Sequence, residues 1–274
     1  MNKITASEVN NLRKQTGAGM MDCKKALVES SGDFEKAIDI LRKKGQKIAA
    51  KRADRSASEG VVISTVNSSK NFGIIVSLNC ETDFVAKNED FIKLANSIMD
   101  IAIKNETSTK EELCSLQFTN GKSIEENIIE QTGIIGEKLE LKLKSINAEY
   151  VSCYVHAGSR LASMVGFDKQ VNENIAKDVA MQIAAMNPIA IDKDSVSEET
   201  INKEIEIGKD LAKQEGKPEN MLDKIAIGRL NKFFKENTLL SQTFIKDSKM
   251  SVSKYIASNT DNAKVLSFER VGLS

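Results

Sequence analysis

The 274-residue sequence lacks the residue groupings on which most enzymes depend. It contains one histidine, His156, and no glycine-rich phosphate loop, GxSxG motif or HExxH motif. No serine or cysteine nucleophile is indicated beside His156, and one histidine with scattered cysteines does not supply the three or four ligands of a zinc site. We therefore expect no enzymatic activity, no cofactor and no metal. His156 is interpreted as a structural or interface residue, with a catalytic role as the alternative.

The sequence also lacks paired cysteines and long apolar segments. Cys23, Cys80, Cys114 and Cys153 are far apart and form no CxxC spacing, so we interpret them as small buried apolar residues. The longest apolar runs, such as residues 72–78, are much shorter than the about 20 residues of a membrane span. The N-terminus resembles neither a secretory leader nor an organellar transit peptide. We expect a cytoplasmic protein that does not bind membranes.

What the chain does contain is enough apolar material for a core, and an uneven distribution of charge. Apolar residues make up 41% of the sequence, and the length suggests roughly two domains. Residues 1–55 include thirteen Lys or Arg but only seven Asp or Glu, although the whole chain is balanced. This basic region indicates a macromolecular partner. An RNA-binding protein is the alternative, but the only aromatic residue of the region, Phe34, is at an inward helical position, so we expect no direct nucleic-acid binding.

The first 45 residues predict three short amphipathic helices that form a bundle. Thr5 and Glu8 form a capping box for the first, which should stop at Gly17. Asp22 is predicted to cap the second helix, and a third helix is predicted from Asp33 to Gly45. Residues 46–58 are predicted to be a basic linker.

An α+β core is predicted after the bundle, and it is internally duplicated. Strands 61–66 and 74–80 form a hairpin, and a helix capped by Asn88 follows. Capping boxes at Ser108 and Ser123 predict two further helices, and Leu139, Leu141 and Leu143 a further strand. A second copy comprises strands near 150–156 and 161–167 and a helix through 171–187.

An antiparallel helical hairpin is inserted into the second copy, at residues 196–237. A short helix at 252–256 and a strand at 265–271 should return the chain to the second sheet. The predicted domains are the bundle and linker (1–55), core subdomain N (56–145), core subdomain C (146–195 and 238–274) and the hairpin.

Two segments stand out between these elements. The first, the docking loop Thr16–Cys23, carries two glycines and the flexible pair Met20 and Met21, which suits contact with a groove on a partner. The second is Thr82–Lys87, which joins strand to helix where the second copy has only residues 168–170. Its Phe84 and Val85 could turn into the core or face a partner, and the pattern alone leaves both open.

The segments 16–27 (TGAGMMDCKKAL) and 80–87 (CETDFVAK) closely resemble the two signature segments of the bacterial elongation factor Ts family. The resemblance extends over almost the whole chain, including residues 73–75, 155–158, 182–188 and 268–270. It implies a ubiquitin-associated-like bundle that docks on elongation factor Tu, in its GDP-bound and nucleotide-free forms. It also implies a guanine-nucleotide exchange factor of protein biosynthesis that disturbs the magnesium and phosphate site of its partner.

The same resemblance assigns roles to individual residues. Thr82, Asp83, Phe84 and Val85 would form a wedge segment that enters the partner near its magnesium ion, and the helical hairpin would be a dimerisation element. Many family members have a further helical module after the last core strand; because this chain ends at Ser274, we do not expect that contact. The implied partner-binding residues are Arg13, Thr16, Gly17, Ala18, Gly19, Met20, Met21, Asp22, Cys23, Ala86, His156 and Gly158.

Overall fold

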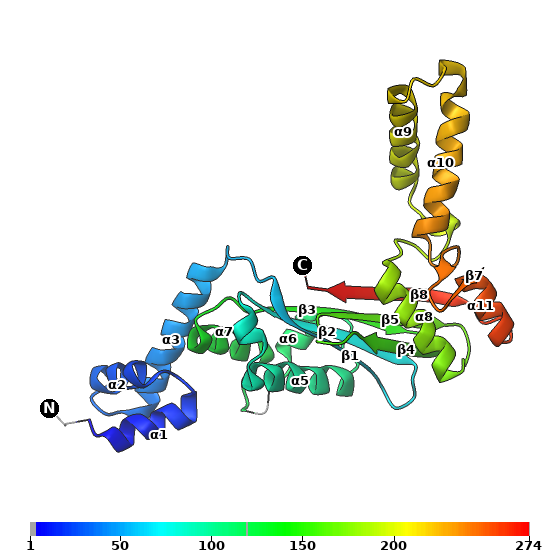
Figure 1. The fold of residues 1–274 in the computed structure, drawn as a ribbon. Helices are drawn as coiled ribbons and strands as arrows, with labels where there is room; N and C mark the ends of the chain where they lie inside the picture. The colour runs from blue at the N-terminus through cyan, green and yellow to red at the C-terminus, as the bar shows by residue number, and fades with distance from the viewer. Residues whose placement is uncertain (1–3, 119, 274) are drawn as a thin grey trace. The chain divides into compact units, whose positions relative to one another are not determined.

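A computed structural model describes residues 4–118 and 120–273 of the chain (Figure 1). Residues 1–3 of the predicted bundle, residue 119 of predicted core subdomain N and residue 274 of predicted core subdomain C lie outside the described residues. The chain divides into two compact units: the first comprises Met1–Ile63, Val76–Lys144 and Gly272–Ser274, and the second Ser64–Ile75 and Ser145–Val271. The predicted α+β class is confirmed, because helices alternate with small antiparallel sheets. The four-part domain division stays a prediction.

The first unit begins with three helices, α1 (Ala6–Thr16), α2 (Met20–Glu29) and α3 (Phe34–Arg52). The predicted capping box is present: the Thr5 hydroxyl accepts from the Glu8 amide, and the Glu8 carboxylate accepts from the Thr5 amide. Gly17 ends α1 with a left-handed φ of 71°. The three helices share an apolar core. Its buried members are Val9, Leu12, Ala18, Cys23, Ala26, Leu27 and Ala37.

Two predicted boundaries in this bundle are wrong. The second helix begins at Met20 with Gly19 at the N-cap position, and Asp22 forms an ion pair with Lys44 instead of capping. The third helix does not end at Gly45 but continues to Arg52, so most of the predicted linker is helical. A glycine inside a helix costs only about 1 kcal/mol. The buried Gly45 packs against a helix from a later part of the chain, and helix-favouring residues follow it. Both features offset that cost.

The first sheet has the strand order β1-β2-β3, with β1 at Glu59–Val66, β2 at Phe72–Cys80 and β3 at Glu140–Asn147. All nine residues of β2 are buried, because it is the central strand. Three helices accompany this sheet: α5 (Glu89–Lys104), α6 (Lys110–Ser115) and α7 (Ile124–Ile135). Asn88 caps α5 and Ser123 forms the predicted capping box of α7, but α6 is capped by Thr109 and not by Ser108.

The second sheet has the order β4-β5-β8, with β4 at Tyr150–Val155, β5 at Leu161–Phe167 and β8 at Val265–Gly272. β4 and β5 are antiparallel, with Tyr150 opposite Phe167. The predicted return of the last strand to this sheet is confirmed. Helices α8 (Glu173–Met186) and α11 (Val252–Asn259) belong to the same unit, and a small hairpin of β6 (Thr243–Phe244) and β7 (Asp247–Ser251) was not predicted. The largest fully buried side chain of this core is Phe167.

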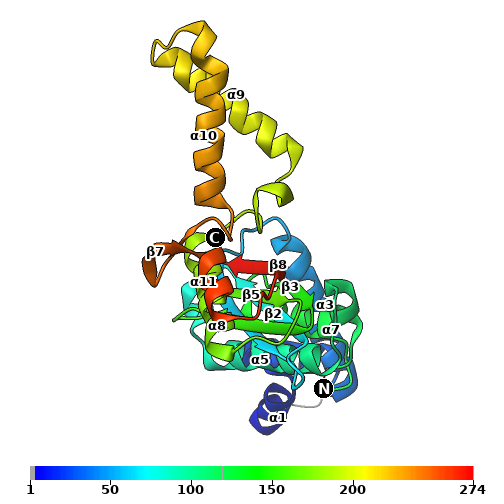
Figure 2. The same cartoon turned by 90° about the vertical axis from the view of Figure 1, so that its right-hand side faces the viewer.

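The helical hairpin of the second unit consists of α9 (Glu198–Gln214) and α10 (Leu222–Asn237), with short 3-10 turns η1 (Lys193–Ser195) and η2 (Glu219–Met221) before each helix. The two helices run side by side and project away from the second sheet in both views (Figures 1 and 2). Ion pairs Lys209–Asp223 and Arg229–Glu215, both 2.6 Å, link them. Within the described part of the chain, no helix has the length and apolar character needed to cross a membrane.

Candidate functional site

The wedge segment contains a one-turn helix, α4 (Asp83–Ala86), directly after β2. Thr82 is the N-cap and its hydroxyl accepts a hydrogen bond from the Val85 amide. Phe84 is 83% exposed, whereas Ala86 is buried and Val85 is half-buried. The question that the sequence left open therefore has a different answer for each residue: Phe84 faces solvent, whereas Val85 is half-buried. An aromatic side chain this exposed is unusual, since aromatic residues bury large apolar areas when they can.

The base of the wedge segment is fixed by Glu137, a residue that the sequence analysis did not single out. Its carboxylate accepts hydrogen bonds from the Glu81 amide (3.1 Å), the Thr82 amide (3.0 Å) and the Thr82 hydroxyl (2.7 Å). Hydrogen bonds to an ionised acceptor are about twice as strong as neutral ones. Glu137 follows Gly136, which ends α7 in a left-handed conformation, so the C-terminus of α7 positions it.

Glu81 connects the same base to two further segments. Its carboxylate accepts from the Arg52 guanidinium at 2.7 and 2.9 Å and from the Lys138 amide at 2.6 Å. Burial raises the pKa of Glu81, but the Lys138 amide and Arg52 outweigh this and leave that pKa below the ordinary glutamate value. The residue before the wedge is therefore an ionised junction between α3 and the segment after α7.

The charges of the wedge segment itself are local. Lys87 lies 2.6 Å from the Asp83 carboxylate, and this hydrogen bond lowers the pKa of Asp83 below its ordinary range. Burial, followed by the negative charge of Glu137, raises the pKa of the Cys80 thiol to about 12. Cys80 is thus a protonated, buried residue and not a thiolate nucleophile.

A pocket of about 420 Å³ lies beside α4 in the first unit. Val85, Phe91 and Leu94 contribute apolar surface to its lining, as does Ile134 of α7, and Gly17 of the docking loop is also part of the lining. The pocket shows that the two signature segments, represented in its lining by Gly17 and Val85, which are 68 residues apart, lie close to one surface of the first unit.

The docking loop divides into inward and outward residues. Ala18 and Cys23 are buried in the bundle core, and Thr16 donates a hydrogen bond from its hydroxyl to the Leu12 carbonyl. Met20 and Met21 are 58% and 62% exposed and form an apolar patch on the first turn of α2. Arg13 is exposed on the last turn of α1. The remaining candidates, Gly17, Gly19 and Asp22, serve the local geometry as helix end, N-cap and ion-pair partner of Lys44.

His156 and Gly158 lie in the second unit, in the turn between β4 and β5. His156 is exposed, and its Nδ1 lies 2.9 Å from the Tyr154 hydroxyl. Gly158 has a φ of 85°, a left-handed conformation that glycine adopts without strain. Among the residues that the structure describes, no cluster of three metal-ligating side chains occurs.

Comparison with known proteins places the chain among translation factors. The family model described as "Elongation factor TS" matches residues 81–274. An elongation factor Ts from Christiangramia forsetii is 56% identical over 276 residues, and one from Flavobacterium psychrophilum is 50% identical over 276 residues, each alignment covering 100% of both chains. One from Cytophaga hutchinsonii is 49% identical over 278 residues, again with both chains fully covered.

The fold, the exposed wedge segment and these matches define a translation elongation factor. The chain belongs to the elongation factor Ts family. The resemblance found in the two signature segments is thereby confirmed, and it extends over the full length.

Proposed function

We propose that this chain is a cytoplasmic guanine-nucleotide exchange factor that binds elongation factor Tu and promotes release of GDP, without enzymatic activity of its own. The observation that carries the proposal is Phe84, an aromatic side chain 83% exposed on a helical turn with a fixed base. Such a side chain is presented to a partner and gains apolar burial only when the partner binds.

Burial of Phe84 alone is not enough to account for a large acceleration of GDP release. A thousandfold faster release needs a barrier lower by about 4 kcal/mol, whereas burial of one phenylalanine gives about 1.5 to 3 kcal/mol. The patch of Met20 and Met21 supplies a second contact that holds the wedge segment in place. Phe84 then shifts the elements around the nucleotide, while Asp83, paired with Lys87, redirects polar contacts and does not ligate the magnesium ion.

Linkage gives the direction of binding. A factor that weakens nucleotide binding must itself bind more weakly to the nucleotide-bound partner, by the same ratio. We expect the nucleotide-free partner to bind most tightly, with the GDP-bound form as the substrate of exchange.

Ion pairs within the basic region weigh against the rival RNA-binding function. Four basic residues of the region are engaged in ion pairs: Lys36 with Asp33, Arg42 with Glu126, Lys44 with Asp22 and Arg52 with Glu81. These ion pairs reduce the number of basic side chains that are available to bind phosphates. Retention on a polyanion column with a steep salt dependence would favour RNA binding instead.

A stopped-flow measurement of labelled GDP leaving purified elongation factor Tu tests the exchange function. Phe84→Ala should slow the stimulated release by about 10- to 100-fold, the equivalent of the apolar burial lost. Its thermal stability should stay within about 0.5 kcal/mol of wild type, because the side chain is exposed. Leu266→Ala, which removes an apolar side chain that is 52% exposed on β8, is the control and should not change release. Release as fast as wild type with Phe84→Ala would refute the wedge.

The docking role is tested in the full chain by a double substitution, Met20→Asp with Met21→Asp. Removing residues 1–45 is a poor alternative, because the cut would fall within α3. The double variant should weaken binding to the nucleotide-free partner and keep its own fold, since both side chains are exposed. Unchanged affinity would exclude the patch from the interface.

We also propose that α9 and α10 mediate a homodimer, since Ile207, Leu211 and Ile227 are exposed on this hairpin. Sedimentation of wild type against Ile227→Glu distinguishes a dimer from a monomer.

A further inference from the structure

Helix α3 crosses helix α7 with no side chain between the two backbones. Gly45 of α3 is buried there, and the Cα of Gly133 on α7 would lie 3.6 Å from a Cβ atom at position 45. The reverse is far tighter: a Cβ atom at position 133 would lie 2.4 Å from the Cα of Gly45. Real Cβ atoms do not approach backbone this closely, so any residue other than glycine at 133 forces the helices apart.

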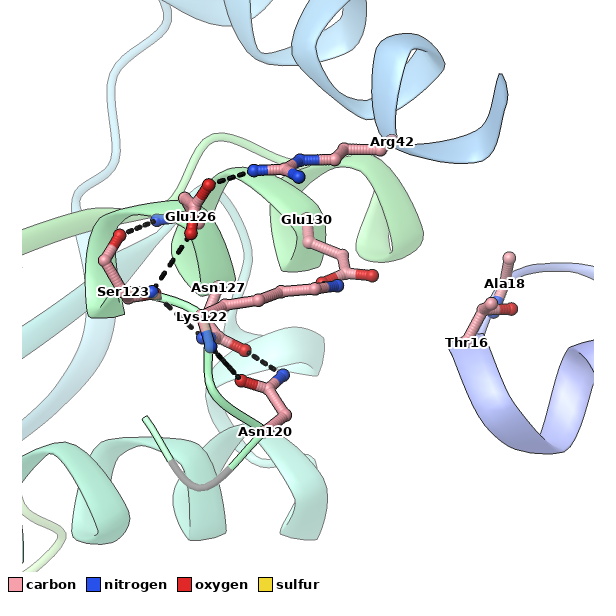
Figure 3. A network of polar contacts seen from close by, with 9 residues as sticks. All are labelled: Thr16, Ala18, Arg42, Asn120, Lys122, Ser123, Glu126, Asn127 and Glu130. Carbon is pink, nitrogen blue, oxygen red and sulfur yellow. Dashed lines mark hydrogen bonds and ion pairs between the residues drawn. The ribbon is translucent and has the colours of Figure 1, made fainter. Parts of the chain in front are cut away.

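Polar contacts flank the crossing on the α7 side (Figure 3). Arg42, one turn before Gly45, forms an ion pair with Glu126, whose other oxygen completes the capping box with Ser123. Lys122 pairs with Glu130 at 2.6 Å on the same face of α7. The ion pair on Glu126 therefore joins α3 to the start of α7, three residues from the glycine contact along α3 and seven along α7.

The two ends of α3 contact different parts of the first unit. At its start, Ala37 is buried in the bundle core that carries the docking loop. At its end, the Arg52 guanidinium binds Glu81, the residue next to Thr82, and the Ala53 carbonyl accepts from the Lys138 ammonium at 2.7 Å. The 19 residues of α3 form one helix about 28 Å long, at 1.5 Å per residue.

We propose that α3, locked on α7 by the Gly45–Gly133 crossing, sets the position of the Met20–Met21 patch relative to the wedge before the partner binds. Gly133 is then a positioning residue for exchange, although it touches neither signature segment's exposed side chains. The proposal rests on the proposed exchange function. Its physical content is preorganisation: two contacts held at a fixed separation bind together without the entropy cost of ordering a flexible tether.

A Cβ atom has less space at position 133 than at position 45, so alanine substitutions at the two glycines form a matched pair of variants. Gly133→Ala and Gly45→Ala raise helix propensity equally, but only the first collides with backbone. Hydrogen–deuterium exchange of the amides of residues 46–52 should accelerate by about tenfold or more in Gly133→Ala, because the crossing opens. Gly45→Ala should match wild type. Unchanged exchange in Gly133→Ala, or equal acceleration in both variants, would overturn the crossing as a lock.

Binding to the nucleotide-free partner tests the positioning role. Gly133→Ala should bind about tenfold more weakly or worse, as for a two-site ligand whose rigid spacer becomes flexible, and Gly45→Ala should bind as wild type. If exchange accelerates at α3 and affinity stays the same, the crossing exists but does not position the patch. If wild type itself neither binds the partner nor releases GDP, the proposed function fails, and the positioning role with it, while the hydrogen-exchange asymmetry still reports on the crossing.

A second variant covers the case in which Gly133→Ala does not fold. Arg42→Glu removes the ion pair and places a carboxylate beside Glu126, but adds no side chain at the glycine contact. It should accelerate exchange at residues 46–52 and weaken partner binding in the same direction. Wild-type behaviour in both measurements would contradict the proposal.

Discussion

Replacing Glu137 by alanine should release the base of the wedge segment without disturbing the sheet. The substitution removes the acceptor of three hydrogen bonds, two from the amides of Glu81 and Thr82 and one from the Thr82 hydroxyl. A hydrogen bond to a charged group contributes about 1.5 to 3 kcal/mol. Glu137 is half-buried, so water can replace part of these three hydrogen bonds. The expected total loss of stabilising free energy is therefore about 1.5 to 3 kcal/mol. At 1.36 kcal/mol per factor of ten, the open form of the segment becomes about 10- to 150-fold more populated.

Two assays read this change directly. Hydrogen exchange of the amides at residues 82–87 should accelerate by the same factor, and stimulated GDP release from elongation factor Tu should slow. Glu137→Gln keeps one acceptor oxygen and the side-chain volume but loses the charge, so it should fall between alanine and wild type. Glu140→Ala is the control, because its carboxylate forms an ion pair with Lys142 of β3 at 3.5 Å and accepts none of the three hydrogen bonds that hold the wedge segment.

Two outcomes would contradict the proposed support of the wedge segment by Glu137. If Glu137→Ala leaves both the protection of residues 82–87 and GDP release unchanged, the carboxylate does not support the wedge. If exchange accelerates while GDP release stays at the wild-type rate, the rigidity of the segment does not contribute to its action.

Two further predictions concern titrating groups. Because burial raises the pKa of Cys80 to about 12, only about one thiol in ten thousand is ionised at pH 8, and iodoacetamide should label Cys80 only after denaturation; labelling of the native protein within minutes would contradict its burial. Burial and then the hydrogen bond to Asp178 raise the pKa of Tyr255 to about 12, above the 10.0 of a free tyrosine. Its neutral form therefore stabilises the fold fully below pH 10, and this contribution is lost as the pH rises through 12. The gap in unfolding free energy between wild type and Tyr255→Phe, measured in urea, should shrink between pH 10 and 12, and a constant gap would contradict the assigned pKa.

Local sequence signals predicted the elements whose determinants are also local. The capping boxes at Thr5 and Ser123 involve residues three positions apart, and the structure has both as expected. Gly45 was misinterpreted as a helix end because a glycine after an amphipathic run usually is one. Its actual partner, Gly133, is 88 residues away, and no local pattern reports that contact.

In the candidate site, too, local sequence signals predicted only the features whose determinants are local. Composition and spacing identified the wedge segment as unusual, but its helical turn and the exposure of Phe84 follow from contacts with residues outside it. Glu137 and Arg52 reach the segment from about 55 and 30 residues away, and each is an ordinary charged residue within its own sequence neighbourhood. The only local signal for Glu137 was its place after Gly136, a residue typical of helix ends.

The burial of β2 along its whole length has a mechanical consequence for the wedge. A side chain that displaces part of a partner is pushed back with equal force, and a compliant support would yield before the partner did. Here the segment continues directly from a central strand with nine buried residues, and close-packed interiors have low compressibility. If the segment acts as the proposed wedge, the stiffness of that strand would make the partner, and not the segment, undergo the deformation.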